Sequence, residues 1–240
     1  MLDNLNFDKI LFLDIETVPL IYNYSELNTS EKKLWDKKSI SQQRNNETPE
    51  QTYAKAGIFA EFAKVICISV GILVKEKEHF QFRLKSFYGD DEKIILKDFA
   101  ELLNKKFNRK DILLCAHNGK EFDFPFLSRR MLVNGVKLPK VLNNAGKKPW
   151  EVNHLDTMEL WRFGDYKNFT SLDLLAHLFK IPTPKDLMDG ADVKKVYYEE
   201  KNLAKIVEYC QKDVLTVARL LLKYATIEDE ILEKHITILK

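Results

Sequence analysis

The sequence predicts an α/β fold in which a mixed sheet of about five strands is flanked by helices. Two observations lead to this prediction. Short apolar and β-branched runs dominate the first half of the chain, whereas helical periodicity dominates the second half. The 240 residues, of which 45% are hydrophobic and 31% charged, suffice for one substantial hydrophobic core. We therefore expect a single domain over residues 1–240.

Four segments are predicted to be strands, and a fifth lies at the C-terminus. Residues 9–18 read KILFLDIETV, an apolar run interrupted by two acids, and residues 64–74 (KVICISVGILV) are β-branched and apolar. Residues 79–88 (HFQFRLKSFY) alternate aromatic with polar side chains, which is typical of a half-exposed strand. These three segments predict an antiparallel meander. Residues 111–116 (DILLCA) predict a short buried strand, and residues 236–240 a weaker strand or helix.

Helical periodicity follows the meander. Asp90 and Asp91 can cap a helix that runs to about Phe107. Further helices are expected from about 123 to 133, from 171 to 179 with Ser171 as the cap, and from 202 to 224. The inner face of the first helix is predicted to consist of Ile94, Ile95, Phe99 and Leu103.

The stretch from about 19 to 51 is crowded with polar side chains. This composition predicts a surface insertion into the domain, with one or two short helices, for example at residues 30–38.

Charge and cysteine content restrict the class of protein. With 38 basic and 36 acidic residues the net charge is only +2, so a polyanion would have to be bound by a local patch or by metal ions. Cys67, Cys115 and Cys210 are far apart, which argues against a disulfide framework or a cysteine zinc site. No apolar run is long enough to span a membrane. We therefore expect a cytoplasmic protein without a membrane partner.

Four acidic residues stand out by their placement. Asp14 and Glu16 are two apart on a strand, so their carboxylates share a face and repel each other unless a cation relieves the repulsion. Asp123 begins a predicted helix directly after a buried strand. Asp213 follows Tyr209 by four residues on a helix, so both side chains point the same way. Each feature alone has an ordinary explanation, namely a solvated strand end, a helix cap or a surface acid, but all three together favour one shared site.

The segments FLDIET, HNGKEFDFPFL and YCQKDV resemble the three motifs of the DEDD superfamily of 3′→5′ exonucleases, and among them the family B DNA polymerase-like exonucleases. The resemblance spans residues 9–223 and includes HLDTMELW and SLDLLAHLFKIP. It implies a ribonuclease H-like fold with Asp14, Glu16, Asp123 and Asp213 at the four acidic positions. Tyr209 indicates the tyrosine subclass, since the histidine subclass would carry histidine where this chain has Glu208.

The resemblance also implies a mechanism with two divalent cations, Mg²⁺ or Mn²⁺. Asp14 would bridge the ions, Glu16 and Asp213 would complete one site, and Asp123 would help the second. Tyr209 would orient the attacking water. The five residues are thus the expected catalytic set, and the four acids the expected metal ligands.

The same resemblance places three residues at the 3′-terminal nucleotide of the substrate, namely Thr17, Asn118 and Phe122. Phe122 has the alternative of being a core residue. Arg129, Arg130 and Lys185 are candidates for contacts to the phosphate backbone, although such residues are usually solvated. His117 is expected to make a structural hydrogen bond, and no separate role follows for Asp156.

The expected substrate is the 3′ end of single-stranded DNA. Two alternatives stay open from the sequence. One is an RNA exonuclease of the ribonuclease D kind, which uses the same catalytic residues. The other is a catalytically silent module that only binds nucleic acid.

Overall fold

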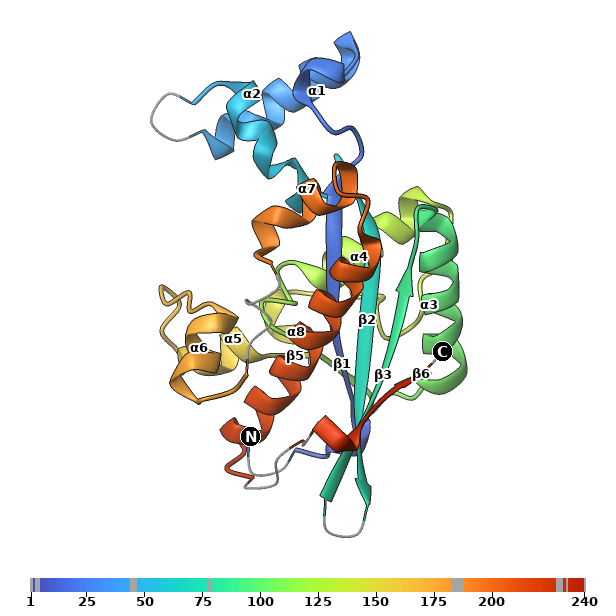
Figure 1. Cartoon of the computed structure of the whole chain (residues 1–240), viewed down its shortest axis with the longest axis vertical. Helices are drawn as coiled ribbons and strands as arrows, with labels where there is room; N and C mark the ends of the chain where they lie inside the picture. The colour runs from blue at the N-terminus through green and yellow to red at the C-terminus, as the bar shows by residue number, and fades with distance from the viewer. Residues whose placement is uncertain are drawn as a thin grey trace.

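A six-stranded mixed sheet forms the centre of the computed structural model, which describes residues 2, 5–43, 47–76, 79–182, 188–227, 231 and 233–239 (Figure 1). The strand order across the sheet is β5-β4-β1-β2-β3-β6. The strands are β1 (Ile10–Pro19), β2 (Ala63–Glu76), β3 (His79–Tyr88), β4 (Leu113–Ala116), β5 (Leu155–Asp156) and β6 (Ile236–Leu239).

The pairing of the strands confirms the predicted α/β class and the antiparallel meander. β1 pairs with β2, and β2 with β3, in antiparallel ladders. β4 is parallel to β1, β5 to β4, and β6 to β3. The prediction of about five strands missed β5, because its two residues are too few to show an alternating pattern.

Helices cover both faces of the sheet. They are α1 (Thr29–Ser39), α2 (Pro49–Thr52), α3 (Glu92–Lys106), α4 (Asp123–Val133), α5 (Thr157–Arg162), α6 (Leu172–Leu178), α7 (Val193–Tyr198) and α8 (Leu203–Tyr224). α3 and α4 pack on one face, and α8 crosses the other (Figure 1). The arrangement is consistent with a ribonuclease H-like exonuclease domain.

The alternation of side chains along β1 divides its residues between the two faces. Leu11, Leu13 and Ile15 belong to the core cluster under α3 and α4. Ile10 and Phe12 belong to the cluster under α8. Because successive strand residues point to opposite faces, the next two residues on the α8 side are Asp14 and Glu16.

The caps of the predicted helices agree with the sequence, but one buried face does not. Asp91 accepts hydrogen bonds from the backbone N–H groups of Lys93 and Ile94 and so caps α3. Ile94 was wrongly predicted to face the core, since it is 57% exposed. Leu96 is buried instead, on the face that it shares with Phe99, Ala100 and Leu103.

Residues 20–43 and 47–62, which lie between β1 and β2, form a lobe at the upper end of the molecule in Figure 1. The predicted short helices are α1 and α2. The lobe has its own hydrophobic cluster around Trp35, whose indole N–H donates to the carbonyl of Pro49 at 2.7 Å. It contacts α7 through the rings of Tyr22 and Tyr198, whose centroids are 4.9 Å apart. The lobe is therefore a packed unit that is anchored near the start of α8.

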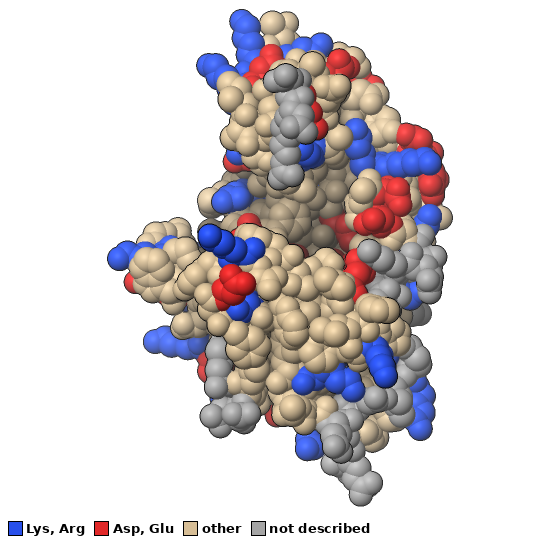
Figure 2. All heavy atoms as spheres, turned by 90° about the vertical axis from the view of Figure 1, so that its left-hand side faces the viewer, with Lys and Arg blue, Asp and Glu red and all other residues tan. Residues whose placement is uncertain are grey.

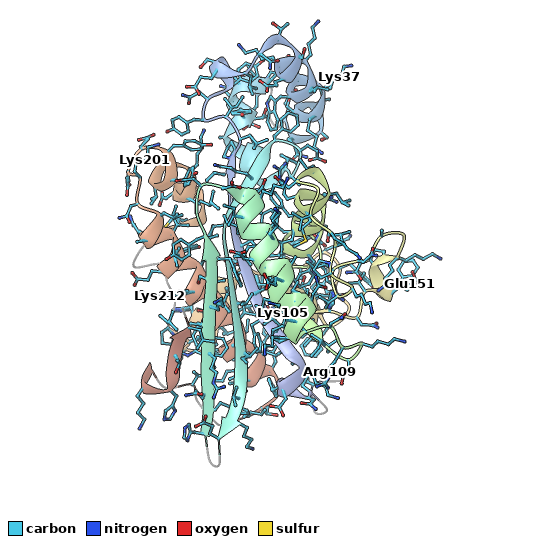
Figure 3. All side chains as sticks on the ribbon, turned by 90° about the vertical axis from the view of Figure 1, so that its right-hand side faces the viewer. Lys37, Lys105, Arg109, Glu151, Lys201 and Lys212 are labelled. Carbon is cyan, nitrogen blue, oxygen red and sulfur yellow. The ribbon has the colours of Figure 1, made fainter. Side chains whose placement is uncertain are left out.

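Surface charge is spread over the molecule. In Figure 3, the labelled side chains of Lys37 on α1, Lys105 on α3 and Lys212 on α8 lie apart from one another, between the lobe and the middle of the molecule. Among the helices of the described ranges, none combines the length and the apolar composition needed to cross a bilayer.

Candidate active site

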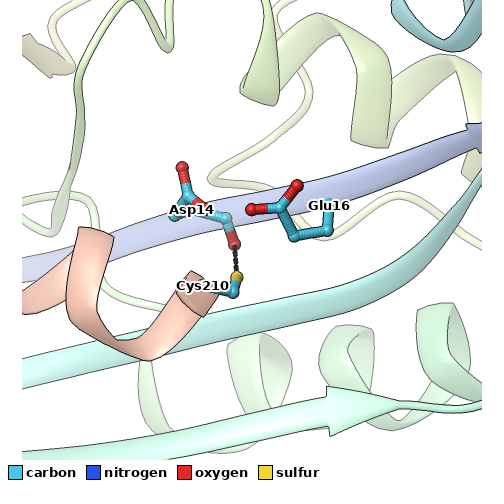
Figure 4. Close-up of side chains that lie close together, drawn as sticks. All are labelled: Asp14, Glu16 and Cys210. Atoms are coloured by element: carbon cyan, nitrogen blue, oxygen red, sulfur yellow. Dashed lines mark hydrogen bonds between the residues drawn. The ribbon is translucent and has the colours of Figure 1, made fainter. Parts of the chain in front are cut away.

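Asp14 and Glu16 lie where β1 separates from β4. The parallel ladder joins only Ile10–Phe12 to Leu113–Cys115, whereas the antiparallel ladder to β2 continues to Pro19. The edge of β1 that faced β4 is therefore without a strand partner from Asp14 onward. Both carboxylates project on the α8 side at this point (Figure 4).

Asp123 occupies the place beside β1 that β4 has left. It is the first residue of α4 and only 3% exposed. Backbone hydrogen bonding from its own N–H and from that of Ile15 lowers the pKa of its carboxyl group in part. Its Oδ1 atom is buried and has no hydrogen-bond partner among the described residues. The separation of β1 and β4 thus brings the start of α4 to the two acids of β1.

Tyr209 and Asp213 reach the same place from α8. They are one helical turn apart, and hydrogen bonding between the Tyr209 hydroxyl and the Asp213 carboxylate lowers the pKa of Asp213 in part. α8 is strongly amphipathic, and its buried stripe of Ile206, Val214 and Val217 packs on β1 and β2. Packing of the helix therefore fixes the direction of both polar side chains.

The four carboxylates have raised pKa values because they are buried near one another. Burial is the largest cause for Asp14, followed by the charges of Glu16, Asp213 and Asp123. Burial and then the charge of Asp213 likewise raise the pKa of Glu16. Burial raises the pKa of Asp123 to about 8 and that of Asp213 to about 7. A cation among these groups would oppose both causes.

The donor atoms fit a divalent cation. The ligand atoms of Asp14, Glu16 and Cys210 all lie within 4.8 Å of one another (Figure 4). Asp14 Oδ2, like Asp123 Oδ1, is buried without a hydrogen-bond partner in the part of the chain that the structure describes. Buried polar atoms are rarely left unpaired in proteins. The acidic group can therefore hold a metal ion.

Two thiols lie beside the carboxylates, which the sequence did not indicate. The Cys210 thiol donates to the main-chain oxygen of Asp14 at an S···O distance of 3.4 Å. Cys67 pairs with Glu16 across the β1–β2 ladder, and its thiol lies 3.7 Å from the hydroxyl of Ser69. Both cysteines are free and fully buried. Residues that are far apart in sequence are thus brought together by the packing of α8 on the sheet.

Asp156 holds the turn that leads to Asp123. Its Oδ1 accepts from the backbone N–H of Asn118 at 2.9 Å, and its Oδ2 accepts from that of Lys120 at 3.1 Å. Oδ1 also accepts from the N–H of Met158 and so caps α5. Sequence reasoning missed this role, although an acid directly before a helix is a recognised cap signal.

The three predicted substrate residues differ in their contacts within the chain. The hydroxyl of Thr17 donates to the carbonyl of Gly57 at 2.7 Å, so it joins β1 to the lobe. Asn118 has a positive φ of 62°, and its Oδ1 is buried without a partner among the described residues. The half-buried Phe122 ring packs 5.3 Å from that of Phe126 and against the core, which favours the alternative of a core role.

His117 has the structural role that was predicted. Its Nε2 donates to the carbonyl of Thr170 at 3.0 Å, and its Nδ1 lies 2.9 Å from the hydroxyl of Thr157. Burial lowers the pKa of this imidazole.

The prediction that Arg130 contacts a phosphate backbone was wrong. Arg130 is 4% exposed, and its guanidinium pairs with Glu92 at 2.6 Å and donates to the carbonyl of Ala60. Arg129 is exposed and lines a cavity of about 620 Å³ together with Asn118 and Asp156. Lys185 lies outside the described residues.

Comparison with known proteins identifies the family. No curated protein matches the chain. A family model described as a predicted 3′-5′ exonuclease related to the exonuclease domain of PolB matches residues 58–238, well over half of the chain. The matched segment contains Asp123, Tyr209 and Asp213, while Asp14 and Glu16 precede it on β1. An exonuclease domain implies a nucleic-acid substrate. The chain therefore belongs to the family of predicted 3′-5′ exonucleases related to the exonuclease domain of PolB.

Proposed function

We propose that this protein is a 3′→5′ exonuclease that hydrolyses the terminal phosphodiester bond of single-stranded DNA with the help of two Mg²⁺ or Mn²⁺ ions. The observation that carries the proposal is the group of four carboxylates delivered by β1, α4 and α8, of which Glu16 and Asp123 are buried and Asp14 and Asp213 half-buried. Such a cluster is costly unless cations occupy it. The family match supports the direction of hydrolysis.

Asp14, Glu16, Asp123 and Asp213 would hold the ions. Their oxygen atoms are the hard ligands that Mg²⁺ and Mn²⁺ prefer. When bound, a pair of such ions acidifies the attacking water and neutralises charge that develops on the phosphate oxygens. The unpaired Oδ2 of Asp14 and Oδ1 of Asp123 support their assignment as ligands.

Tyr209 would position the attacking water. Burial, followed by the charges of Asp213, Glu16 and Asp14, raises the pKa of its phenol far above the ordinary value. The hydroxyl therefore stays protonated at neutral pH, and it can hold a water molecule but cannot take its proton. Hydrogen bonding to Asp213 orients the hydroxyl toward the acids.

Burial of the acids supports a single-stranded substrate. Glu16 is 8% and Asp123 3% exposed, so the scissile phosphate must reach well below the surface. Figure 2 shows a hollow between the lobe and the part of the molecule that carries α5 and α6. A flexible strand can enter such a hollow end first, whereas a paired duplex end is much wider. The relation of the family to the exonuclease domain of PolB supports DNA over RNA.

The test uses the purified chain, Mg²⁺ or Mn²⁺, and four single strands, namely DNA and RNA that each carry a label at the 5′ or the 3′ end. We expect a ladder of shortened products from 5′-labelled DNA and immediate release of a labelled nucleotide from 3′-labelled DNA. Asp14→Ala should abolish both. Glu208→Gln is a matched control, because Glu208 is an exposed acid one residue before Tyr209.

Each other outcome has a definite meaning. Faster cleavage of RNA than of DNA would make RNA the substrate class. Release of label from 5′ ends would contradict the proposed direction. A chain that binds the strands but cleaves none of them with either metal would be a silent binding module.

A further inference from the structure

Exposed aromatic side chains are concentrated in one part of the chain. Trp150, Phe163, Tyr166 and Phe169 are 67–84% exposed, and among the described residues Tyr88 is the only other exposed aromatic side chain. These four residues form the aromatic surface. Large apolar side chains gain nothing for the fold from such exposure, and clusters of them mark binding sites.

A cavity of about 620 Å³ joins the two segments that carry the aromatic surface. Its walls include Pro149 from the segment before β5, and Arg162 and Tyr166 from the end of α5 and the loop after it. Trp150 directly follows Pro149 in the chain. The Arg162 guanidinium lies 4.4 Å from the centroid of the Phe169 ring, which places this ring at the cavity as well.

Basic side chains accompany the rings. The Lys148 ammonium lies 5.4 Å from the centroid of the Trp150 ring, and Arg162 lies over Phe169 as described. Arg129 is exposed and lines the same cavity. Surfaces that bind single-stranded nucleic acid combine rings on which bases stack with cations that meet the phosphates. The cavity and its surroundings have this combination.

The cavity adjoins the turn that leads to Asp123. Asn118 and Asp156 belong to its wall, and Asp156 fixes the turn through the backbone N–H of Asn118. Among the described residues that line the cavity, none is one of the four acids or Tyr209, so the cavity is separate from the proposed site of hydrolysis. A strand whose 3′ end lies at Asp123 can therefore continue past this turn onto the aromatic surface.

We propose that the aromatic surface binds the single strand upstream of the nucleotide that is removed, through stacking of bases on Trp150, Tyr166 and Phe169. The identity of the strand as substrate rests on the proposed function. Every base has a π-face, so the surface accepts any single strand, whereas the bases of a duplex are already stacked inside the helix. Four basic and three acidic residues line the cavity, so stacking contributes more than charge and the affinity should depend only weakly on salt.

The binding test is carried out in chelator, so that no strand is cleaved. The probes are fluorescent oligothymidylates of about 3 and about 12 nucleotides, because sites for single strands span roughly 4–16 nucleotides. Tyr166→Ala should weaken binding of the longer strand roughly 5- to 150-fold and leave that of the shorter strand unchanged. Tyr166→Phe should retain the affinity, since the ring and not the hydroxyl stacks.

The control for these variants is Tyr88→Ala, which removes an exposed tyrosine of β3 and should not change the affinity. Equal binding of the longer strand by Tyr166→Ala and the unaltered chain would overturn the proposal. No saturable binding of that strand, or equal losses in Tyr166→Ala and Tyr166→Phe, would do the same.

The emission of Trp150 gives a second readout in the unaltered chain. A base that stacks on this exposed indole should quench its fluorescence, whereas Trp35 is fully buried. Trp150→Phe should keep most of the affinity and lose most of the quenching. Quenching that persists in Trp150→Phe would place the strand elsewhere and contradict the proposal.

Two further measurements test other occupants of the aromatic surface. A duplex of the same length should bind more weakly than the single strand, and equal affinities would overturn the stacking of bases. Sedimentation velocity should show the same monomeric species for Tyr166→Ala and the unaltered chain. A dimer that Tyr166→Ala dissociates would assign the surface to a second copy of the chain instead.

Cleavage in Mg²⁺ then separates this proposal from the proposed function. Tyr166→Ala should raise KM for the longer strand by the factor found in the binding test and leave kcat unchanged, because Tyr166 lies outside the acidic group. Cleavage with an unaltered KM would overturn the role of the surface and leave the nuclease standing. A chain that binds strands through Tyr166 but cleaves none of them would refute the proposed function and leave the surface standing.

Discussion

The Asp156 carboxylate accepts a hydrogen bond from the backbone N–H of Asn118 at 2.9 Å and thereby fixes the turn from which Asp123 enters the acidic group. The second oxygen of Asp156 accepts from the N–H of Lys120, so both are used. A residue without an evident role in the sequence is thus the support of a proposed metal ligand.

Asp156→Asn should destabilise the fold by about 1–3 kcal/mol, because its amide group would face the N–H of Asn118 or Lys120 and leave that donor unpaired. Thermal unfolding should show a decrease of roughly 2–4 °C per kcal/mol. Cleavage should also slow, as Asp123 moves with the turn. Asp98→Asn, at an exposed position of α3, is the control and should change neither quantity. An unaltered melting temperature in Asp156→Asn would contradict the supporting role.

The metal-free chain should be less stable at about pH 8.5 than at about pH 5.5, because these two pH values bracket the raised pKa values of the acidic group. The pKa values of Asp123 and Asp213 are raised in the folded chain, to about 8 and about 7. A carboxyl group whose pKa is raised in the folded chain contributes its full stabilisation of the fold below its unfolded pKa of about 4. This contribution is lost as the pH rises through its pKa in the folded chain. Thermal unfolding in chelator measures the effect.

Two changes should reduce this dependence of stability on pH. Asp123→Asn removes one of the charges, so the fall in stability above neutral pH should become smaller. Mg²⁺ or Mn²⁺ should restore stability at the higher pH, because the ions bind the ionised carboxylates of the folded chain. A stability that rises with pH in chelator would contradict the burial of these acids.

Tyr209→Phe should slow cleavage by roughly 10- to 100-fold and leave activity that the acid variants lack, because only a positioning contact is removed. The pH profile of the variant should parallel that of the unaltered chain, since the raised pKa keeps the phenol protonated. Loss of an ionisation from the profile would show instead that Tyr209 acts as a base. Tyr197→Phe is a suitable control, because its hydroxyl donates to Asp90 on the surface.

Arg130→Met should cost about 3–5 kcal/mol of stability, because Glu92 would be left buried without its cationic partner. Its neighbour Arg129 is exposed, so Arg129→Met should change stability by less than about 0.5 kcal/mol. Urea unfolding of the two variants gives the comparison. Similar values for both would contradict the assignment of Arg130 to the core.

Gly119→Ala should destabilise the chain by about 1–3 kcal/mol through overpacking. A Cβ atom at this position would lie 2.4 Å from Ala116 Cβ and 2.9 Å from Phe124 Cζ. At Gly57 the nearest atom would be at an ordinary 3.6 Å, so Gly57→Ala is the matched control. Equal unfolding midpoints for Gly119→Ala and Gly57→Ala would show that the turn at Gly119 can shift without loss of stability.

The sequence predicted the elements with strong local patterns. The three meander strands, the cap of α3 by Asp91 and the helix from Asp123 to Val133 are all present. These features depend on residues that are neighbours along the chain, where periodicity and capping act. β5 was missed because it exists only through its pairing with β4.

The candidate site could be predicted only as far as its residues carry a local pattern. Asp14 and Glu16 lie together, as their spacing indicates. The thiol of Cys210 beside them depends on how α8 packs on the sheet, and the ion pair of Arg130 with Glu92 joins α4 to α3. Neither contact leaves a trace in the spacing of residues. The roles of Asp14, Glu16, Asp123, Tyr209 and Asp213 in catalysis and metal binding stay predictions that the experiments above address.

The acidic group is assembled from the first strand, the start of α4 and the last long helix of the chain. During synthesis, α8 leaves the ribosome after β1–β5 and α1–α7, so a nascent chain holds Asp14 and Glu16 long before Asp213 arrives. A truncated or half-made chain therefore lacks the complete set of carboxylates and cannot degrade nucleic acid by the proposed mechanism. Under the proposed mechanism, activity would arise only after α8 has been synthesised.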